Sequence, residues 1–354
     1  RSLGMGGVGV DSGNAANAGF MNPALLSAAH EDDDFSLELP ILGARFSDTD
    51  RLIDEIDTYQ DSNLEANLTT AIDNSNAADA AANVPTANTE SGNVATATRA
   101  FQTQLNKIDN KPIQGEVFGG MVIGIPSKKV GASLNINAYV VAGGVFDYTT
   151  GAGSDDAMLQ GIITAADAVA TLADPTQLSG DSFVTAQDTG TDVVSNLTSN
   201  LGVRGAVISE VGLSLSREVN IGGHDIAVGI TPKVVKVKTF HYVLGANTAD
   251  IDSDKGTKDF SDFNIDVGLA KDYGNGWKAG LVVKNLIGKE YDTAPFASPG
   301  LTNVPSATIK VDPQVRLGIS HANEWLTVAA DLDVTENEPV GFESKTQYLG
   351  IGAE

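Results

Sequence analysis

Residues 325–334 read WLTVAADLDV, and their side chains alternate between two types. Every second residue from Leu326 to Val334 is apolar, whereas the residues between them are small or polar, among them Asp331 and Asp333. A period of two is typical of a β-strand with one apolar and one polar face. A run of about ten such residues is longer than the usual strand of a soluble sheet but suits a tilted strand that crosses a membrane.

Nine further runs of this kind lie before and after the first one. Short connections such as Gly274-Asn275-Gly276 alternate with long excursions, of which the largest span residues 47–112 and 149–203. Tight turns would therefore lie at one end of the sheet and long loops at the other, as in outer-membrane barrels. We predict an all-β fold, an antiparallel up-and-down transmembrane β-barrel with partly helical outer loops. The other nine predicted strands span residues 35–46, 117–125, 130–138, 204–216, 225–242, 260–272, 277–287, 309–320 and 346–353.

Both long excursions contain stretches with helical spacing of apolar residues. Residues 51–72 show this spacing, and a helix is predicted over residues 155–172. The segment between 73 and 98 is rich in Asn, Ala and Thr, and we expect it to be loosely ordered. The apolar stripes either pack against each other or offer an access surface for a hydrophobic ligand. That surface would consist of Leu52, Ile56, Leu159, Ile162 and Ile163.

The composition limits the class of protein. The chain has 354 residues, no cysteine and a net charge of -24. No stretch approaches the roughly 18 apolar residues of a transmembrane helix. The absence of cysteine excludes thiol catalysis and thiolate metal sites, and the negative charge argues against nucleic acid as a partner. Because the chain begins at Arg1 and ends within a predicted strand, we expect a mature product without its signal peptide and further strands beyond residue 354.

The amino-terminal residues 1–30 are rich in Gly, Ala and Asn and have no period of two. We interpret them as a plug inside the barrel, which residues 31–354 would form; a disordered tail is the alternative. Small residues allow such a segment to pack closely against the inner wall. The run from Gly4 to Gly9 matches the dinucleotide-binding pattern GxGxxG, but no strand can precede it, so we reject a nucleotide site.

Two groups of residues resemble a known family of barrels. Residues 4–10 (GMGGVGV), followed by residues 22–26 (NPALL), resemble the amino-terminal signature of the FadL-like superfamily of outer-membrane barrels. Later runs are similar to the TraF-type branch, which is associated with conjugal plasmid transfer. The resemblance implies a plug that gates the lumen and a complete barrel of about fourteen strands. The predicted gate residues are Gly4, Gly6, Gly7, Gly9, Asn22 and Pro23, and the TraF-like runs span residues 280–288, 312–320, 325–340 and 347–354.

These features favour a FadL-like channel in the bacterial outer membrane for passive uptake of hydrophobic small molecules. Its partners would be outer-membrane lipid and lipopolysaccharide, with a long-chain hydrophobic ligand or detergent in the lumen. Two alternatives remain open. One is a structural or assembly barrel associated with conjugal plasmid transfer, and the other is a soluble all-β binding protein.

We expect neither enzymatic activity nor a cofactor. The four histidines, at positions 30, 224, 241 and 321, have no metal-ligand spacing, and no serine or aspartate beside them indicates a catalytic triad. Residues 250–256 resemble the start of a calcium loop, but Lys255 occupies the place of its glycine. A solvated acidic loop is the simpler interpretation of that segment. The weak calcium candidates are Asp250, Asp252 and Asp254.

Overall fold

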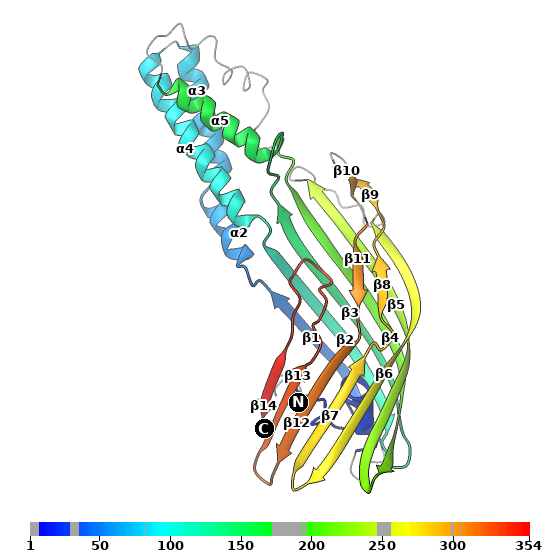
Figure 1. Cartoon of the computed structure of the whole chain (residues 1–354). Helices are drawn as coiled ribbons and strands as arrows, with labels where there is room; N and C mark the ends of the chain where they lie inside the picture. Colours follow the sequence, from blue (N-terminus) through cyan, green and yellow to red (C-terminus); the bar gives the residue numbers. More distant parts are fainter. Residues whose placement is uncertain are drawn as a thin grey trace.

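A computed structural model describes residues 7–28, 35–81, 83–171, 193, 196–245, 256–298, 301–304 and 306–354. Its main feature is one antiparallel sheet of ten strands in the order β1-β2-β3-β4-β5-β6-β7-β12-β13-β14. The sheet curls into a half-barrel (Figure 1). Among the described residues no ladder joins its two edge strands, β1 and β14, so a closed barrel stays a prediction. No helix in the described ranges is both long and apolar enough to cross a membrane.

The ten strands of the sheet correspond to the ten predicted runs, which confirms the interpretation of the alternating pattern. They are β1 (Ser36–Ser47), β2 (Pro112–Ile125), β3 (Gly131–Asp147), β4 (Asn200–Ile221), β5 (His224–Gly245), β6 (Thr257–Gly274), β7 (Trp277–Lys284), β12 (Gln314–Ala322), β13 (Thr327–Asp333) and β14 (Leu349–Ala353). Several boundaries differ by a few residues, and β3 continues nine residues beyond the predicted end at 138. One predicted strand is not continuous. The predicted strand over 309–320 divides at Asp312-Pro313, because a proline cannot donate to the ladder.

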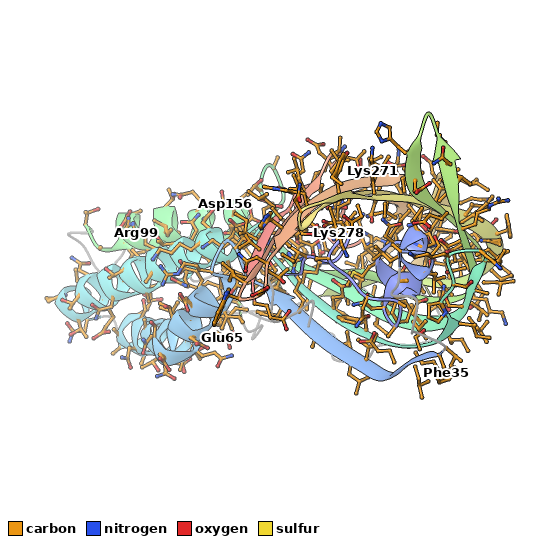
Figure 2. The ribbon with its side chains drawn as sticks, turned by 90° about the horizontal axis from the view of Figure 1, so that it is seen from below. Phe35, Glu65, Arg99, Asp156, Lys271 and Lys278 are labelled. Atoms are coloured by element: carbon orange, nitrogen blue, oxygen red, sulfur yellow. The ribbon has the colours of Figure 1, made fainter. Side chains whose placement is uncertain are left out.

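The two faces of the sheet differ in chemistry. On the convex face every strand carries exposed apolar side chains; Val211 and Leu213 on β4, for example, are each 49% exposed. On the concave face small and polar side chains such as Glu210 and Ser214 are buried. Figure 2 shows side chains projecting outward around the curve of the sheet. One exposed apolar residue from each strand, in sheet order, is Leu42, Val117, Ile136, Leu213, Val234, Phe263, Trp277, Ile319, Leu332 and Ile351.

The amino-terminal segment, residues 7–28, lies on the concave face of the sheet (Figures 1 and 2). It contains a short helix, α1 (Ala18–Met21), and a 3₁₀ helix, η2 (Pro23–Leu26). Asn22 caps η2, and its side-chain oxygen accepts a hydrogen bond from the Ala24 N–H at 3.1 Å. The apolar side of η2 packs against Ala227 of β5 and Ala270 of β6.

Four helices form an arm that projects from the end of the sheet opposite the tight turns (Figure 1). They are α2 (Leu52–Asp61), α3 (Leu64–Ala80), α4 (Val84–Ile108) and α5 (Asp155–Val169). The expected loose order of residues 73–98 was wrong, since α3 and α4 run through most of that stretch. Alanine is the strongest helix former, and its small side chain lets two helices approach closely. Ala71 and Ala78 of α3 accordingly pack with Ala87 and Ala95 of α4.

Two small ladders follow β7. β8 (Lys289–Asp292) pairs with β11 (Thr308–Val311), and β9 (Phe296–Ser298) pairs with β10 (Leu301–Val304). The β8–β11 ladder folds over the main sheet, because Tyr291 and Ile309 are buried against Val235 and Val237 of β5.

Candidate functional site

A cavity of about 600 Å³ lies on the concave face of the sheet. The amino-terminal segment forms one side of it through Asn17, Phe20 and Met21, and residues 310–312 and 336–340 form another. Strand residues supply the remaining wall, and many of them are charged. The charged strand residues that line it include Glu116, Glu210, Lys233, Asp266, Lys284 and Arg316.

Lys233 is the centre of a buried ion-pair network in this wall. Its Nζ lies 3.1 Å from Glu210 Oε1 on β4 and 3.0 Å from Asp266 Oδ1 on β6. The three side chains are only 5%, 11% and 10% exposed. The Asn137 amide also donates to Glu210 Oε2 at 3.1 Å. A buried cation between two carboxylates satisfies charges that would otherwise be costly to remove from water.

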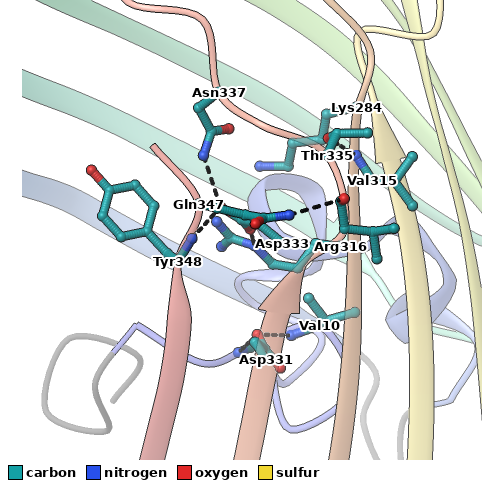
Figure 3. Close-up of polar contacts among 12 residues, drawn as sticks. Val10, Lys284, Val315, Arg316, Asp331, Asp333, Thr335, Asn337, Gln347 and Tyr348 are labelled. Carbon is teal, nitrogen blue, oxygen red and sulfur yellow. Dashed lines mark hydrogen bonds and ion pairs between the residues drawn. The ribbon is translucent and has the colours of Figure 1, made fainter. Parts of the chain in front are cut away.

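Two further cations connect the sheet to segments that lie on it. Lys284 Nζ on β7 donates a hydrogen bond to the Phe20 carbonyl at 2.5 Å, which ties the amino-terminal segment to the wall. Arg316 on β12 donates to Asp333 Oδ1 at 2.5 Å. The other oxygen of Asp333 accepts from the Asn337 amide at 2.8 Å, so this carboxylate orders the start of the connection to β14 (Figure 3).

The connection between β13 and β14, residues 334–348, turns back over the concave face. Arg204 on β4 donates from Nε to the Val340 carbonyl at 3.1 Å and from its terminal nitrogen to the Gly341 carbonyl. Its guanidinium also lies 4.7 Å from the centre of the Phe342 ring. The connection therefore links the end of β13 to β4, two strands that lie far apart in the sheet order.

The structure places three of the gate candidates, Gly9, Asn22 and Pro23, at the contact between the amino-terminal segment and the sheet. Asp331 Oδ2 on β13 accepts hydrogen bonds from the Gly9 and Val10 N–H groups at 2.7 and 3.0 Å (Figure 3). The Asn22 amide donates to the Val10 carbonyl at 2.8 Å and to the Leu269 carbonyl at 3.0 Å. Pro23 is buried beside Asn22. Gly7 adopts a backbone φ of 83°, in the left-handed region that favours glycine. Gly4 and Gly6 lie outside the described residues.

The sequence did not single out Asp331 or Asp11 as site residues. Both are buried where the amino-terminal segment meets the sheet. Burial raises the pKa of the Asp11 carboxyl to about 6, against the opposing effect of the nearby Ser320 hydroxyl. One feature of the sequence could have indicated Asp331. It lies on the polar face of an alternating strand, and in a barrel that face points to the lumen, where it can contact a segment bound there.

The predicted access residues lie in the helical arm. Leu52, Leu159 and Ile163 are buried there, and Ile56 and Ile162 are partly buried. They belong to the interior of the arm; Leu159, for example, packs with Phe101 and Leu105. Their part in ligand access stays a prediction.

The calcium candidates Asp250, Asp252 and Asp254 lie outside the described residues. In the part of the chain that the structure covers, no three or more His, Cys, Asp or Glu side chains gather as metal ligands.

A carboxylate clamps the arm to the start of β4. Asp155, at the first turn of α5, accepts hydrogen bonds from the Thr198 and Ser199 N–H groups at 2.8 and 2.6 Å. Burial alone would raise the pKa of Asp155, but these hydrogen bonds and those from the two hydroxyls outweigh it and hold the pKa below its usual range.

We expect this clamp to release in acid. A carboxyl whose pKa is lower in the folded state stabilises the fold above its unfolded pKa of about 4 and loses that contribution as the pH falls through the folded value. Asp155→Asn should therefore cost about 1.5–3 kcal/mol at pH 7 and less at pH 3, where part of the contribution of the charge is already lost. Hydrogen exchange of the α5 amides measures the difference. An equal cost at both pH values would contradict the role of the charge.

Comparison with known proteins identifies a family. The family described as "F plasmid transfer operon, TraF, protein" matches residues 19–333, which is most of the chain. No curated protein matches the chain. The family match lends no support to membership of the FadL-like superfamily, which stays a prediction. The matched range runs from α1 through the arm, the cavity wall and the small ladders to β13. The chain therefore belongs to the family of TraF proteins of the F plasmid transfer operon.

Proposed function

We propose that this protein is an outer-membrane β-barrel that serves as a structural or assembly component of conjugal plasmid transfer. In this proposal it has no enzymatic activity and needs no cofactor. The family match supports the link to plasmid transfer. The exposed apolar face of the ten-stranded sheet is the observation that supports the membrane location.

That face is difficult to reconcile with water as the solvent. Soluble monomers rarely expose contiguous apolar patches above a few hundred Å², and burying a Leu, Val or Ile side chain contributes about 1.5–3 kcal/mol. Here all ten strands carry exposed apolar side chains on one face, and nine of them carry Leu, Val or Ile there. Lipid would cover them, while the charged concave face would surround a wet interior.

The two edges of the sheet approach each other at one point. Arg45 near the end of β1 donates a hydrogen bond to the Tyr348 hydroxyl, just before β14, and lies 4.6 Å from the centre of that ring. This contact favours closure of the half-barrel into a cylinder, with residues 7–28 as its plug. The charged lining of the cavity does not favour FadL-like uptake of a hydrophobic molecule.

A pair of matched substitutions tests the membrane location. Leu213 is 49% exposed on the sheet and Ile53 is 41% exposed on α2 of the arm. Arginine on the lipid face of a barrel costs about 2–4 kcal/mol near the bilayer centre. Leu213→Arg should therefore reduce the amount of folded, heat-modifiable protein in the outer-membrane fraction, whereas Ile53→Arg should not. Equal amounts of both variants in a soluble fraction would contradict the proposal.

The arm is the part that we expect to contact the transfer apparatus. Its helices have their own apolar core and project beyond the sheet, so its tip can change without disturbing the strands. Replacing residues 64–98 with a short flexible linker should leave the protein in the outer membrane but lower plasmid transfer between donor and recipient cells to the level of a strain without the protein. Unchanged transfer, or loss of fatty-acid uptake instead, would favour the channel interpretation.

A further inference from the structure

Two buried carboxylates face each other across the contact between the amino-terminal segment and the sheet. Asp11 is 3% exposed and Asp331 on β13 is 4% exposed. Within the described residues, both oxygens of Asp11 and Oδ1 of Asp331 are buried without a hydrogen bond of normal geometry, although the Ser320 hydroxyl lies near enough to Asp11 to lower its pKa. Buried polar atoms of native proteins nearly always have a partner, so three such oxygens in one place indicate that something binds to them.

The unpartnered oxygens converge above Gly318 on β12. A Cβ atom at Gly318 would lie 2.6 Å from Asp331 Oδ1 and 2.9 Å from Asp11 Oδ1. Only glycine therefore leaves room for the two carboxylates at this point of the wall. Ser320, two residues further along β12, is 4% exposed and contributes a hydroxyl oxygen beside Asp11.

Two positive charges of the sheet act on these carboxylates. Arg316 is hydrogen-bonded to Asp333 at 2.5 Å, and Lys278 of β7, which stands opposite Ser320 in the ladder with β12, lowers the pKa of Asp11 through its charge alone. Asp331 itself is held in place because its Oδ2 accepts the Gly9 and Val10 N–H groups. Such a second contact fixes the orientation of a ligating carboxylate and leaves Oδ1 available.

We propose that Asp11 and Asp331, with the Ser320 hydroxyl, bind a hard divalent cation of the calcium type. Calcium takes about six to eight oxygen ligands in irregular geometry. Both oxygens of Asp11, Oδ1 of Asp331 and the Ser320 hydroxyl would supply part of that shell, and water would complete it. The charge of the cation offsets that of the two carboxylates. One ligand comes from the amino-terminal segment and the others from the sheet, so the site exists only when the segment is docked. Cation binding and docking are therefore linked.

The test uses the full chain purified in detergent, with calcium chloride or EDTA at pH 7.5. Calcium binding is measured by calorimetry, and docking by the rate at which a protease cleaves within residues 7–28. At calcium about ten times above its dissociation constant, cleavage should slow about tenfold. Asp11→Asn keeps the shape of the side chain but removes its charge, and should abolish both the binding and the protection. Asp225→Asn, at an exposed turn, is the control and should keep both.

A second variant keeps both charges. Gly318→Ala places a methyl group between the two carboxylates and should lower calcium affinity while Asp11 and Asp331 remain. The proposal is wrong if calcium neither binds nor slows cleavage, or if Asp11→Asn responds to calcium like the unmodified chain. It is also wrong if a shift from pH 7.5 to pH 5 protects the segment and calcium does not, because the two carboxyls then share a proton instead of a cation.

Discussion

Replacing Lys233 with methionine should destabilise the protein by about 3–5 kcal/mol, because the change leaves two buried carboxylates without their counter-ion. Glu210 and Asp266 lie 3.1 and 3.0 Å from the lysine Nζ, and all three side chains are at most 11% exposed. Methionine retains the length and apolar stem of lysine, so the loss reports on charge and not on packing volume. The free energy of unfolding in urea, measured in detergent, gives the effect.

A triple variant distinguishes the effect of leaving the carboxylates unpaired from the effect of removing the whole ion-pair network. Glu210→Gln, Lys233→Met and Asp266→Asn together remove every charge of the group and should restore most of the stability, since replacing a whole buried ion network by neutral residues is often nearly neutral. If the single Lys233→Met variant is as stable as the unmodified chain, water reaches these carboxylates and the network is not buried as the structure places it.

The strands could be predicted from the sequence because the pattern that indicates them lies within each strand. A strand with one face on lipid or core and the other on polar groups needs a strict period of two, and Leu326 to Val334 keeps it without a break. The tight connection at Gly274-Asn275-Gly276 is equally local, and β6 and β7 do meet there. Both features depend only on neighbours in the chain.

The ion-pair network of Lys233 could not be predicted from the sequence, because it depends on the register between strands. Lys233 stands opposite Gly212 on β4 and Asn264 on β6, so its partners Glu210 and Asp266 are diagonal neighbours two residues away. A shift of the ladder by one residue would move them to the other face. No pattern within a single strand contains that information.

Two other parts were missed for different reasons. Residues 73–98 are rich in Asn and Thr, which favour loops on their own, but alanines at helical spacing let α3 and α4 pack closely and outweigh that preference. The connection over 334–348 has no periodic signal, and its position depends on tertiary contacts of Arg204 with Val340, Gly341 and Phe342. Such contacts between distant segments become visible only in three dimensions.

Replacing Gly229 with alanine should displace the amino-terminal segment from the sheet. A Cβ atom at Gly229 would clash with the backbone nitrogen of Ala24 and the carbonyl carbon of Pro23, which cannot move without shifting η2. Overpacking of a tight contact typically costs about 1–3 kcal/mol. The amides of residues 24–27 should then exchange with solvent faster and the segment should be cleaved sooner by protease, while the strands keep their protection.

The matched control is Gly115→Ala on β2, where a Cβ atom would meet nothing within 4 Å. Both substitutions add one methyl group to a strand glycine and change strand propensity alike, so only the contact with the amino-terminal segment differs. If the two variants expose residues 23–27 equally, the segment is not held against β5 by close packing. If only Gly229→Ala exposes these residues, the absence of a side chain at Gly229 is what lets the amino-terminal segment dock against β5. Close packing against this segment then explains why the concave face of the sheet contains glycines.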